Sequence, residues 1–189
     1  KDFDNDGSID PIMFYFIQGT SYPAFSRDEM SDQLPGIKKK FLLHKDYAKA
    51  RLNDIFTTEE LAGSKMLKAE FMETIFLENT GKEMKLHHLP AEANYAPVYG
   101  IVAADFNGDQ KIDLLLTGNN TWTRVRFGRY TSNHGILLTG DGAGNFRYQP
   151  QTISGLNLSG NIRSAGLLND NQVLLGVNDG NAIRLTFNK

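Results

Sequence analysis

Short apolar runs bounded by turn-forming residues cover most of this chain, and they predict β-strands. Each run is only a few residues long, which fits a strand better than a helix, and each ends near glycine, asparagine or another polar turn residue. The 18 glycines often stand beside asparagine or aspartate, as they do in tight turns. The pattern therefore predicts an all-β fold. The expected strands are residues 12–17, 74–77, 84–87, 98–104, 112–117, 136–139, 145–148, 162–168, 173–177 and 182–187.

Residues 21–70 interrupt this strand pattern with charged and aliphatic residues at helical spacing. Ser26 followed by Glu29 fits a capping box, and Thr58 with the acidic residues after it fits a helix start. We therefore expect two to four short helices in this segment, inserted between two strands of the β-fold.

A nine-residue acidic loop occurs twice, each time directly before an expected strand. Both copies have oxygen-bearing side chains at loop positions 1, 3, 5 and 9, phenylalanine at position 2 and isoleucine at position 8. Carboxylates so close together repel one another unless a cation lies among them. Oxygen donors without histidine or cysteine favour Ca²⁺. The copies are Asp2-Phe3-Asp4-Asn5-Asp6-Gly7-Ser8-Ile9-Asp10 and Asp105-Phe106-Asn107-Gly108-Asp109-Gln110-Lys111-Ile112-Asp113.

An EF-hand loop is the nearest competing interpretation, because it also begins with alternating acidic residues. That loop needs a bidentate carboxylate at position 12, on the helix that follows it. Here position 12 is Met13 or Leu116, each inside an expected strand, so the EF-hand interpretation fails. An acidic turn without metal stays open as an alternative, although two matched copies argue against it.

The two loops also align the strands as repeat units. If the strand before a loop is counted first, residues 98–150 hold one complete four-strand unit. Residues 165–172 align with the loop but lack its first and last carboxylates, so we expect no ion there. The expected segments are 1–20 (partial unit with an acidic loop), 21–70 (helical insertion), 71–97 (remainder of the first unit), 98–150 (complete unit) and 151–189 (degenerate terminal unit).

This arrangement resembles the FG-GAP/VCBS repeats of integrin-alpha-type β-propellers, and most closely the bacterial proteins that pair VCBS repeats with an ASPIC/UnbV module. The resemblance rests on the second loop with the three leucines after it, on the hairpin at 136–146 and on Gly128-Arg129-Tyr130. It covers roughly residues 1–20 and 74–189. It implies β-propeller blades, one per repeat unit, with Ca²⁺ in the loops. It also implies a location outside the cytoplasm: extracellular, at the cell surface or in the periplasm.

A propeller typically has four to eight blades, and about three incomplete units cannot close one. The chain also begins inside a repeat motif. We therefore expect a longer parent chain whose missing part supplies further blades.

The resemblance also assigns the calcium ligands by loop position. Two sites are implied, with affinities of roughly 10⁻⁴ to 10⁻³ M, as in other extracellular modules. Gln110 stands where the family usually has glycine, at a position that often needs an unusual backbone angle. The implied ligands are Asp2, Asp4, Asp6, Asp10 and the Ser8 carbonyl in the first loop, and Asp105, Asn107, Asp109, Asp113 and the Lys111 carbonyl in the second.

A polar, aromatic loop at residues 118–133 is the candidate surface for a protein or glycan partner. It joins strands two and three of its unit, as the helical insertion does, so both segments are expected on one face. The alternative is that its aromatic rings pack on the insertion and its arginines pair with acidic residues there. The loop also contains Phe127, and the candidate partner-binding residues are Trp122, Arg124, Arg126, Arg129 and Tyr130.

Composition removes several other functions. A net charge of −2 gives no basic field for nucleic acid, and no run approaches 18 apolar residues, so no membrane span is expected. The absence of cysteine excludes disulfides and thiolate chemistry. His87 and His88 with Glu92 are a weak zinc candidate, because adjacent strand residues point to opposite faces.

No catalytic Ser/His/Asp arrangement is recognisable from spacing. The sequence therefore favours a non-enzymatic, calcium-binding module for binding or scaffolding. A calcium-dependent propeller enzyme, such as a polysaccharide lyase, is the alternative, and a purely structural blade segment is the third possibility.

Overall fold

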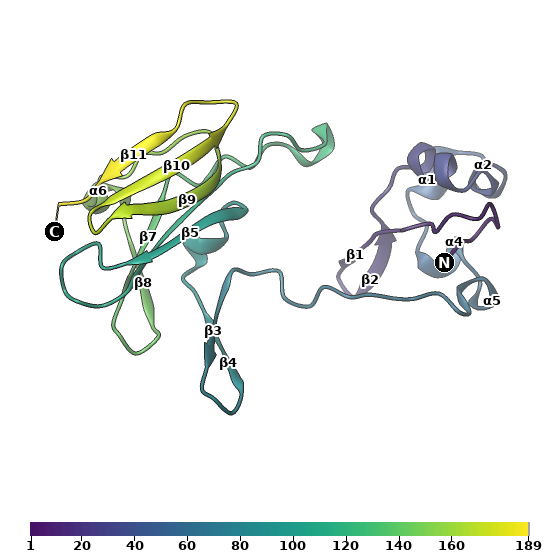
Figure 1. Cartoon of the computed structure of the whole chain (residues 1–189). Coiled ribbons are helices and arrows are strands. Elements are labelled where there is room, and N and C mark those ends of the chain that lie inside the picture. Colours follow the sequence, from purple (N-terminus) through teal and green to yellow (C-terminus); the bar gives the residue numbers. More distant parts are fainter. Residues whose placement is uncertain (189) are drawn as a thin grey trace. The chain divides into compact units, whose positions relative to one another are not determined.

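The computed structural model describes residues 1–188, and the chain divides into two compact units, Lys1–Ala69 and a second unit that begins at Glu70 (Figure 1). Both contain antiparallel strands, and helices are few and short, so the expectation of a mainly β chain is confirmed. Within residues 1–188, none of the helices is long and apolar enough to cross a membrane. We describe each unit by itself.

The first unit follows its acidic loop with one hairpin and five short helices. The hairpin pairs Phe14 with Pro23 and Ile17 with Thr20. The helices are more numerous than the two to four expected, because single-turn pieces form between the longer ones. The elements are β1 (Phe14–Ile17), β2 (Thr20–Pro23), α1 (Arg27–Gln33), α2 (Gly36–Lys40), α3 (His44–Tyr47), α4 (Leu52–Ile55) and α5 (Thr58–Leu61).

Both helix starts expected from the sequence are confirmed. The Glu29 backbone N–H donates to the Ser26 hydroxyl at 3.3 Å, and the Glu29 carboxylate accepts the Ser26 N–H at 2.8 Å. Helix α5 begins at Thr58 and has the same reciprocal capping between Thr57 and Glu60. Such caps satisfy backbone donors that a helix of one or two turns leaves unpaired.

The helices of the first unit are too short to be stable alone, so they depend on a shared apolar core. Met30 is fully buried at its centre. Phe3, from the acidic loop, stacks on Phe56 with ring centroids 4.4 Å apart. The loop is therefore packed into the helical core. The buried members are Met30, Leu34, Ile37, Tyr47, Ala50, Ile55 and Phe56.

Tyr47 gives this core a testable dependence on alkaline pH. Its hydroxyl donates to the Phe25 carbonyl at 3.1 Å. Burial, with a smaller contribution from the Glu29 charge, raises the pKa of Tyr47 from 10.0 to about 12. A raised acid pKa means that the folded state favours the neutral phenol. This stability is complete below pH 10 and is lost as the pH rises from 10 to about 12.

We therefore predict that the free energy of unfolding of the whole chain, measured in urea, falls by up to about 2–3 kcal/mol between pH 10 and 12. Tyr47→Phe should lower stability by about 1 kcal/mol at neutral pH, because the hydroxyl bond is lost, and should flatten the alkaline loss. An equally steep loss in Tyr47→Phe would show that Tyr47 is not responsible.

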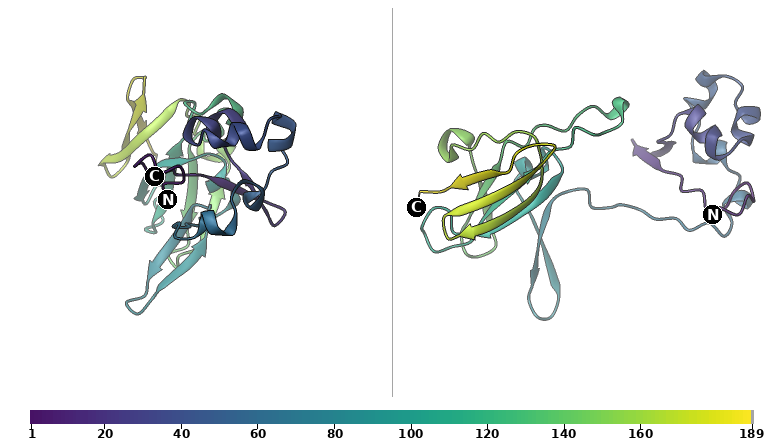
Figure 2. Two further views of the ribbon diagram at one scale, coloured as in Figure 1. Left: turned by 90° about the vertical axis from the view of Figure 1, so that its right-hand side faces the viewer. Right: turned by 45° about the horizontal axis from the view of Figure 1, so that its top comes forward.

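The second unit contains three antiparallel sheets. Strands β5 to β8 form a four-stranded sheet in chain order, β9 to β11 form a three-stranded sheet, and β3 pairs with β4 (Figures 1 and 2). The elements are β3 (Ile75–Asn79), β4 (Met84–His88), η1 (Ala91–Asn94), β5 (Val98–Ala104), β6 (Asp113–Gly118), η2 (Val125–Phe127), β7 (Ile136–Gly140), β8 (Phe146–Gln149), α6 (Gln151–Ser154), β9 (Asn161–Asn169), β10 (Gln172–Asn178) and β11 (Ile183–Thr186).

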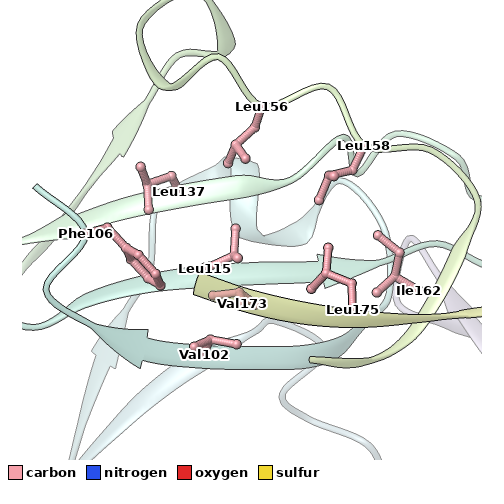
Figure 3. Packing of buried hydrophobic residues seen from close by; sticks show 9 residues of the cluster. All are labelled: Val102, Phe106, Leu115, Leu137, Leu156, Leu158, Ile162, Val173 and Leu175. Atoms are coloured by element: carbon pink, nitrogen blue, oxygen red, sulfur yellow. The ribbon is translucent and has the colours of Figure 1, made fainter. Parts of the chain in front are cut away.

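The main core lies between the four-stranded and the three-stranded sheets (Figure 3). Leu115 and Leu137 on one side face Val173 and Leu175 on the other, and all four are buried. Since neighbouring strand residues point to opposite faces, Leu116 and Leu138 lie on the far side of the same sheet. They form a second buried cluster with Ala93 and Ile136. Both faces of the four-stranded sheet are therefore covered.

The second unit contains the strands expected from the repeat alignment. The four-strand meander spans the segment expected to be complete, and the last segment has three strands. The strand expected at 12–17 pairs with β2, whereas the strands expected at 74–87 pair with each other. That the strand at 12–17 and the strands at 74–87 belong to one blade stays a prediction. The sheets within residues 1–188 do not form a closed propeller, so their interpretation as blades also stays a prediction.

Candidate functional site

The first acidic loop is held by hydrogen bonds from its own backbone to its own carboxylates. Asp2 accepts two of them, from the N–H of Asn5 at 2.7 Å and of Gly7 at 3.0 Å. The loop is closed by Asp10, whose carboxylate accepts the N–H of Phe3 at 2.8 Å. The first and last carboxylates of the loop therefore fix its backbone.

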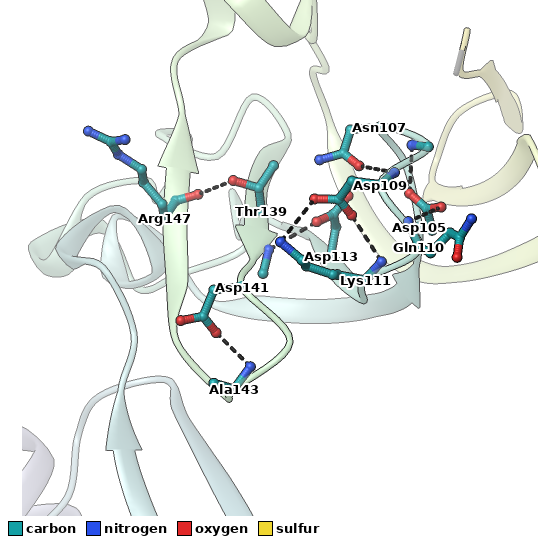
Figure 4. Close-up of polar contacts among 12 residues, drawn as sticks. Asp105, Asn107, Asp109, Gln110, Lys111, Asp113, Thr139, Asp141, Ala143 and Arg147 are labelled. Atoms are coloured by element: carbon teal, nitrogen blue, oxygen red, sulfur yellow. Dashed lines mark hydrogen bonds and ion pairs between the residues drawn. The ribbon is translucent and has the colours of Figure 1, made fainter.

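The second acidic loop repeats these bonds at the same positions (Figure 4). Asp105 accepts the N–H of Gly108 at 2.6 Å and of Gln110 at 3.0 Å. Asp113 closes the loop by accepting the N–H of Phe106 at 3.0 Å. Two loops in different units, with different residues at four of nine positions, thus have one backbone scheme.

The middle of each loop is matched as well. In both copies the side chain at position 3 accepts the N–H of position 5, and the side chain at position 5 accepts the N–H of position 7. In each bond one side-chain oxygen of an expected ligand accepts a backbone N–H, and together the bonds place the expected ligands around one turn. The bonds are Asp6 to Asp4 at 3.3 Å, Ser8 to Asp6 at 2.7 Å, Asp109 to Asn107 at 2.9 Å and Lys111 to Asp109 at 2.9 Å.

Each loop needs two left-handed backbone positions, and each fills one of them with glycine. In the first loop these are Asn5 at φ 62° and Gly7 at 94°. In the second they are Gly108 at 82° and Gln110 at 66°. The unusual angle expected at Gln110 is therefore present. A long side chain in this conformation costs roughly 1–2 kcal/mol relative to a normal angle.

This strain predicts opposite effects for two substitutions in the second loop. Gln110→Gly should raise the free energy of unfolding by about 0.5–1 kcal/mol, because relief of strain outweighs the entropy that glycine adds to the unfolded chain. Gly108→Ala should lower it by about 1–2 kcal/mol. Urea unfolding in excess EDTA would measure both without bound metal. The interpretation would be wrong if Gln110→Gly were the destabilising variant.

The loops differ in how their carboxylates are placed for an ion. In the first, oxygens of Asp2, Asp4 and Asp10 all lie within 4.8 Å of one another. Among residues 1–188 this is the one group of three His, Cys, Asp or Glu side chains that meets this spacing. In the second, position 3 is the amide Asn107, and the Lys111 ammonium lies 3.9 Å from the Asp109 carboxylate. The first loop therefore concentrates more negative charge.

Asp113 joins the second loop to the neighbouring hairpin. Its side chain is fully buried, and its second carboxylate oxygen accepts the N–H of Gly140 at 2.9 Å. A Cβ on Gly140 would lie 2.1 Å from the Ile112 carbonyl oxygen, so only glycine allows this approach. The end of the loop and the β7–β8 turn are thus one structure.

The β7–β8 turn is ordered by its own carboxylate. Asp141 accepts the side-chain N–H of Asn145 at 2.7 Å. It also accepts the backbone N–H of Ala143 at 2.7 Å (Figure 4). These bonds, the one from Asn145 foremost, hold the pKa of Asp141 below its ordinary value. A charged carboxylate therefore caps the turn beside the second loop.

We predict that Gly140→Ala destabilises the protein by about 3 kcal/mol or more, because a methyl group would overlap a backbone carbonyl that cannot move aside cheaply. Gly166→Ala, on β9, is the matched control, since nothing lies within 4 Å of the added carbon there. Urea unfolding of the two variants should separate them clearly. Similar midpoints would refute the role given to Gly140.

The candidate partner residues separate into two groups. Trp122 and Arg129 line one open pocket of about 370 Å³, together with four residues that the sequence did not single out. Tyr130 instead pairs its backbone with Asn120, and the Arg126 guanidinium lies 4.8 Å from the Phe127 ring centroid. The four additional residues are Thr121, Asn161, Asn178 and Asp179.

The weak zinc candidate is not assembled. The His87 ring nitrogen lies 2.9 Å from the Glu78 carboxylate, and the His88 ring nitrogen lies 2.9 Å from the Glu73 carboxylate. The two histidines therefore contact different carboxylates, neither of which is Glu92.

Comparisons with models of protein families, with curated proteins and with solved structures found no match to this chain.

Proposed function

We propose that the chain is a calcium-binding segment of an exported or cell-surface protein, built from FG-GAP/VCBS-type propeller blades and serving as a non-enzymatic binding or scaffolding module. The observation that carries the proposal is the matched pair of acidic loops. They keep one pattern of side-chain oxygens and one backbone scheme in two units that otherwise share little.

Backbone N–H groups alone do not account for the composition of the loops. A turn needs one or two capping carboxylates, whereas the first loop has four within nine residues. The repulsion between these carboxylates is small in water but increases as they come closer together. A divalent cation among them would replace this repulsion with attraction. The ligands available to it are the side chains at positions 1, 3, 5 and 9 and the carbonyl at position 7.

The proposed role of the ion is structural. In the second unit the loop joins β5 to β6, and its last residue, Asp113, is tied to the β7–β8 turn. In the first unit the loop carries Phe3 into the helical core. An ion at either loop would stiffen a connection on which a core depends.

We predict that Ca²⁺ stabilises the protein. At about 10 mM Ca²⁺ and dissociation constants of roughly 10⁻⁴ to 10⁻³ M, each site should contribute about 1.4–2.7 kcal/mol. Thermal unfolding in Ca²⁺ against EDTA, followed by circular dichroism and calorimetry, would measure it. Mg²⁺ at the same concentration should give a smaller shift, because these loops do not provide rigid octahedral geometry.

Single substitutions assign the effect to each loop. Asp4→Asn should reduce the calcium shift of the first unit, and Asp109→Asn that of the second, since each keeps the side-chain size but removes a charge. Asp170→Asn, in the degenerate copy, is the control and should keep the full shift. A wild-type protein that melts identically in Ca²⁺ and EDTA would refute the metal proposal.

A further inference from the structure

The pocket that contains Trp122 is assembled from three separate segments of the second unit. Thr121, Trp122 and Arg129 come from the long loop after β6. Asn161 begins β9, while Asn178 and Asp179 lie at the turn between β10 and β11. Its volume of about 370 Å³ lies within the range of small-molecule sites, roughly 300–1,000 Å³.

The base of the pocket is held by hydrogen bonds between Asn161 and Thr121. The Asn161 side chain is only 6% exposed, and it accepts the Thr121 N–H at 3.0 Å and donates to the Thr121 hydroxyl at 2.7 Å. These two bonds fix the backbone directly before Trp122. Because the buried amide both accepts a hydrogen bond from one loop residue and donates one to it, it restricts the conformational freedom that a surface loop normally has.

A second support holds Trp122 itself. Its backbone N–H donates to the Asn120 side-chain oxygen at 3.1 Å, and the same oxygen accepts a hydrogen bond from the Arg163 guanidinium at 3.2 Å. The Arg163 guanidinium in turn lies over the Tyr99 ring, 3.8 Å from its centroid. The backbone of Trp122 is therefore fixed, whereas its indole is 72% exposed. A firmly held but uncovered indole is suited to receiving a ligand.

The polar groups at the rim complement hydroxyl groups. The Arg129 guanidinium offers several N–H donors, the Asp179 carboxylate is an acceptor, and the Asn178 amide is both. Within residues 1–188, Arg129 has no ion-pair partner. Asp179 has a left-handed φ of 57°, and its carboxylate accepts the Asn178 side-chain N–H at 3.5 Å. Vicinal hydroxyls each donate and accept, so such a mixed set satisfies them where a purely cationic set would not.

We propose that this pocket binds a pyranose ring of a glycan, with its apolar face on the Trp122 indole and its hydroxyls on Asn178 and Asp179. Arg129 then donates hydrogen bonds either to a ring hydroxyl or to the carboxylate of a uronic acid. The inference deepens the binding role proposed above and rests on it, but not on the calcium loops. The second loop precedes β6 and the pocket loop follows it, so the two sites lie at opposite ends of that strand.

The single tryptophan of the chain allows a direct test, since Trp122 alone supplies indole fluorescence. The folded whole chain is titrated with neutral manno- and xylo-oligosaccharides and with oligogalacturonates. We expect a saturable blue shift, with a dissociation constant of about 2 mM for one ring, which is the weak binding expected of a ligand with about twelve heavy atoms. The preferred series shows whether Arg129 meets a hydroxyl or a carboxylate.

Variants that retain the indole make the test specific. Arg129→Ala and Asp179→Asn should each weaken binding about tenfold or more, whereas Arg147→Ala, which removes the same charge from the exposed edge of β8, should leave it unchanged. Asparagine tolerates the backbone angle at 179, so Asp179→Asn should remain folded. Circular dichroism verifies the fold of each variant.

Several outcomes would overturn the proposal. One is the absence of any fluorescence response to all three saccharide series at 50 mM. Another is an unchanged response in Arg129→Ala and Asp179→Asn. A third is that polyglutamate binds as tightly as the oligogalacturonates, which would identify a general anion or peptide site. Titrations in Ca²⁺ and in EDTA separate the proposals: saccharide binding without a calcium shift would refute only the metal sites, and the reverse would refute only the pocket.

Discussion

The buried carboxylate that ends each acidic loop is the constraint on which the rest of the structure depends. Asp113 is fully buried, and burying a charge is costly unless several donors satisfy it. The N–H groups of Phe106 and Gly140 do so, and they come from opposite sides of β6. The same bonds direct Phe106 into the core, where its ring lies 4.4 Å from that of Phe187. One side chain thus fixes a loop, a turn and a core contact.

In the first unit the last carboxylate closes the loop in the same way, although the loop is not part of the four-stranded sheet. Asp10 accepts the N–H of Phe3, and Phe3 stacks on Phe56 of the helical core. The loop is therefore an autonomous motif, closed by its last carboxylate and anchored by the aromatic residue at position 2. Since hydrogen bonds already set the turn of both loops, the proposed ion would have little conformational entropy to overcome, and its affinity would depend mainly on charge and ligand number.

This autonomy explains what could be predicted from the sequence. The loops, the meander of β5–β8 and the helix starts at Ser26 and Thr58 are set by residues close together in the chain. The pairing of β1 with β2 could not be predicted, because the turn between them needs positive φ at both Gln18 and Gly19. Of these two residues, only glycine is typical of such a turn. Trp122 and Arg129 could be singled out as exposed candidates. Their partners could not, because the packing of two sheets brings them close.

The packing of the two sheets tolerates little change in side-chain size, and the geometry of the pocket depends on this packing. A Cβ on Gly100 of β5 would lie 2.6 Å from the Thr117 hydroxyl and 2.9 Å from the Ala165 Cβ of β9, so these strands approach closely only because glycine and alanine meet there. The same strand, β9, begins at Asn161, which is hydrogen-bonded to Thr121. The proposed recognition site therefore depends on the core between the sheets, whereas the acidic loops depend on their own hydrogen bonds. The second acidic loop and the pocket loop lie at opposite ends of β6, so a substitution in one does not directly alter the residues of the other.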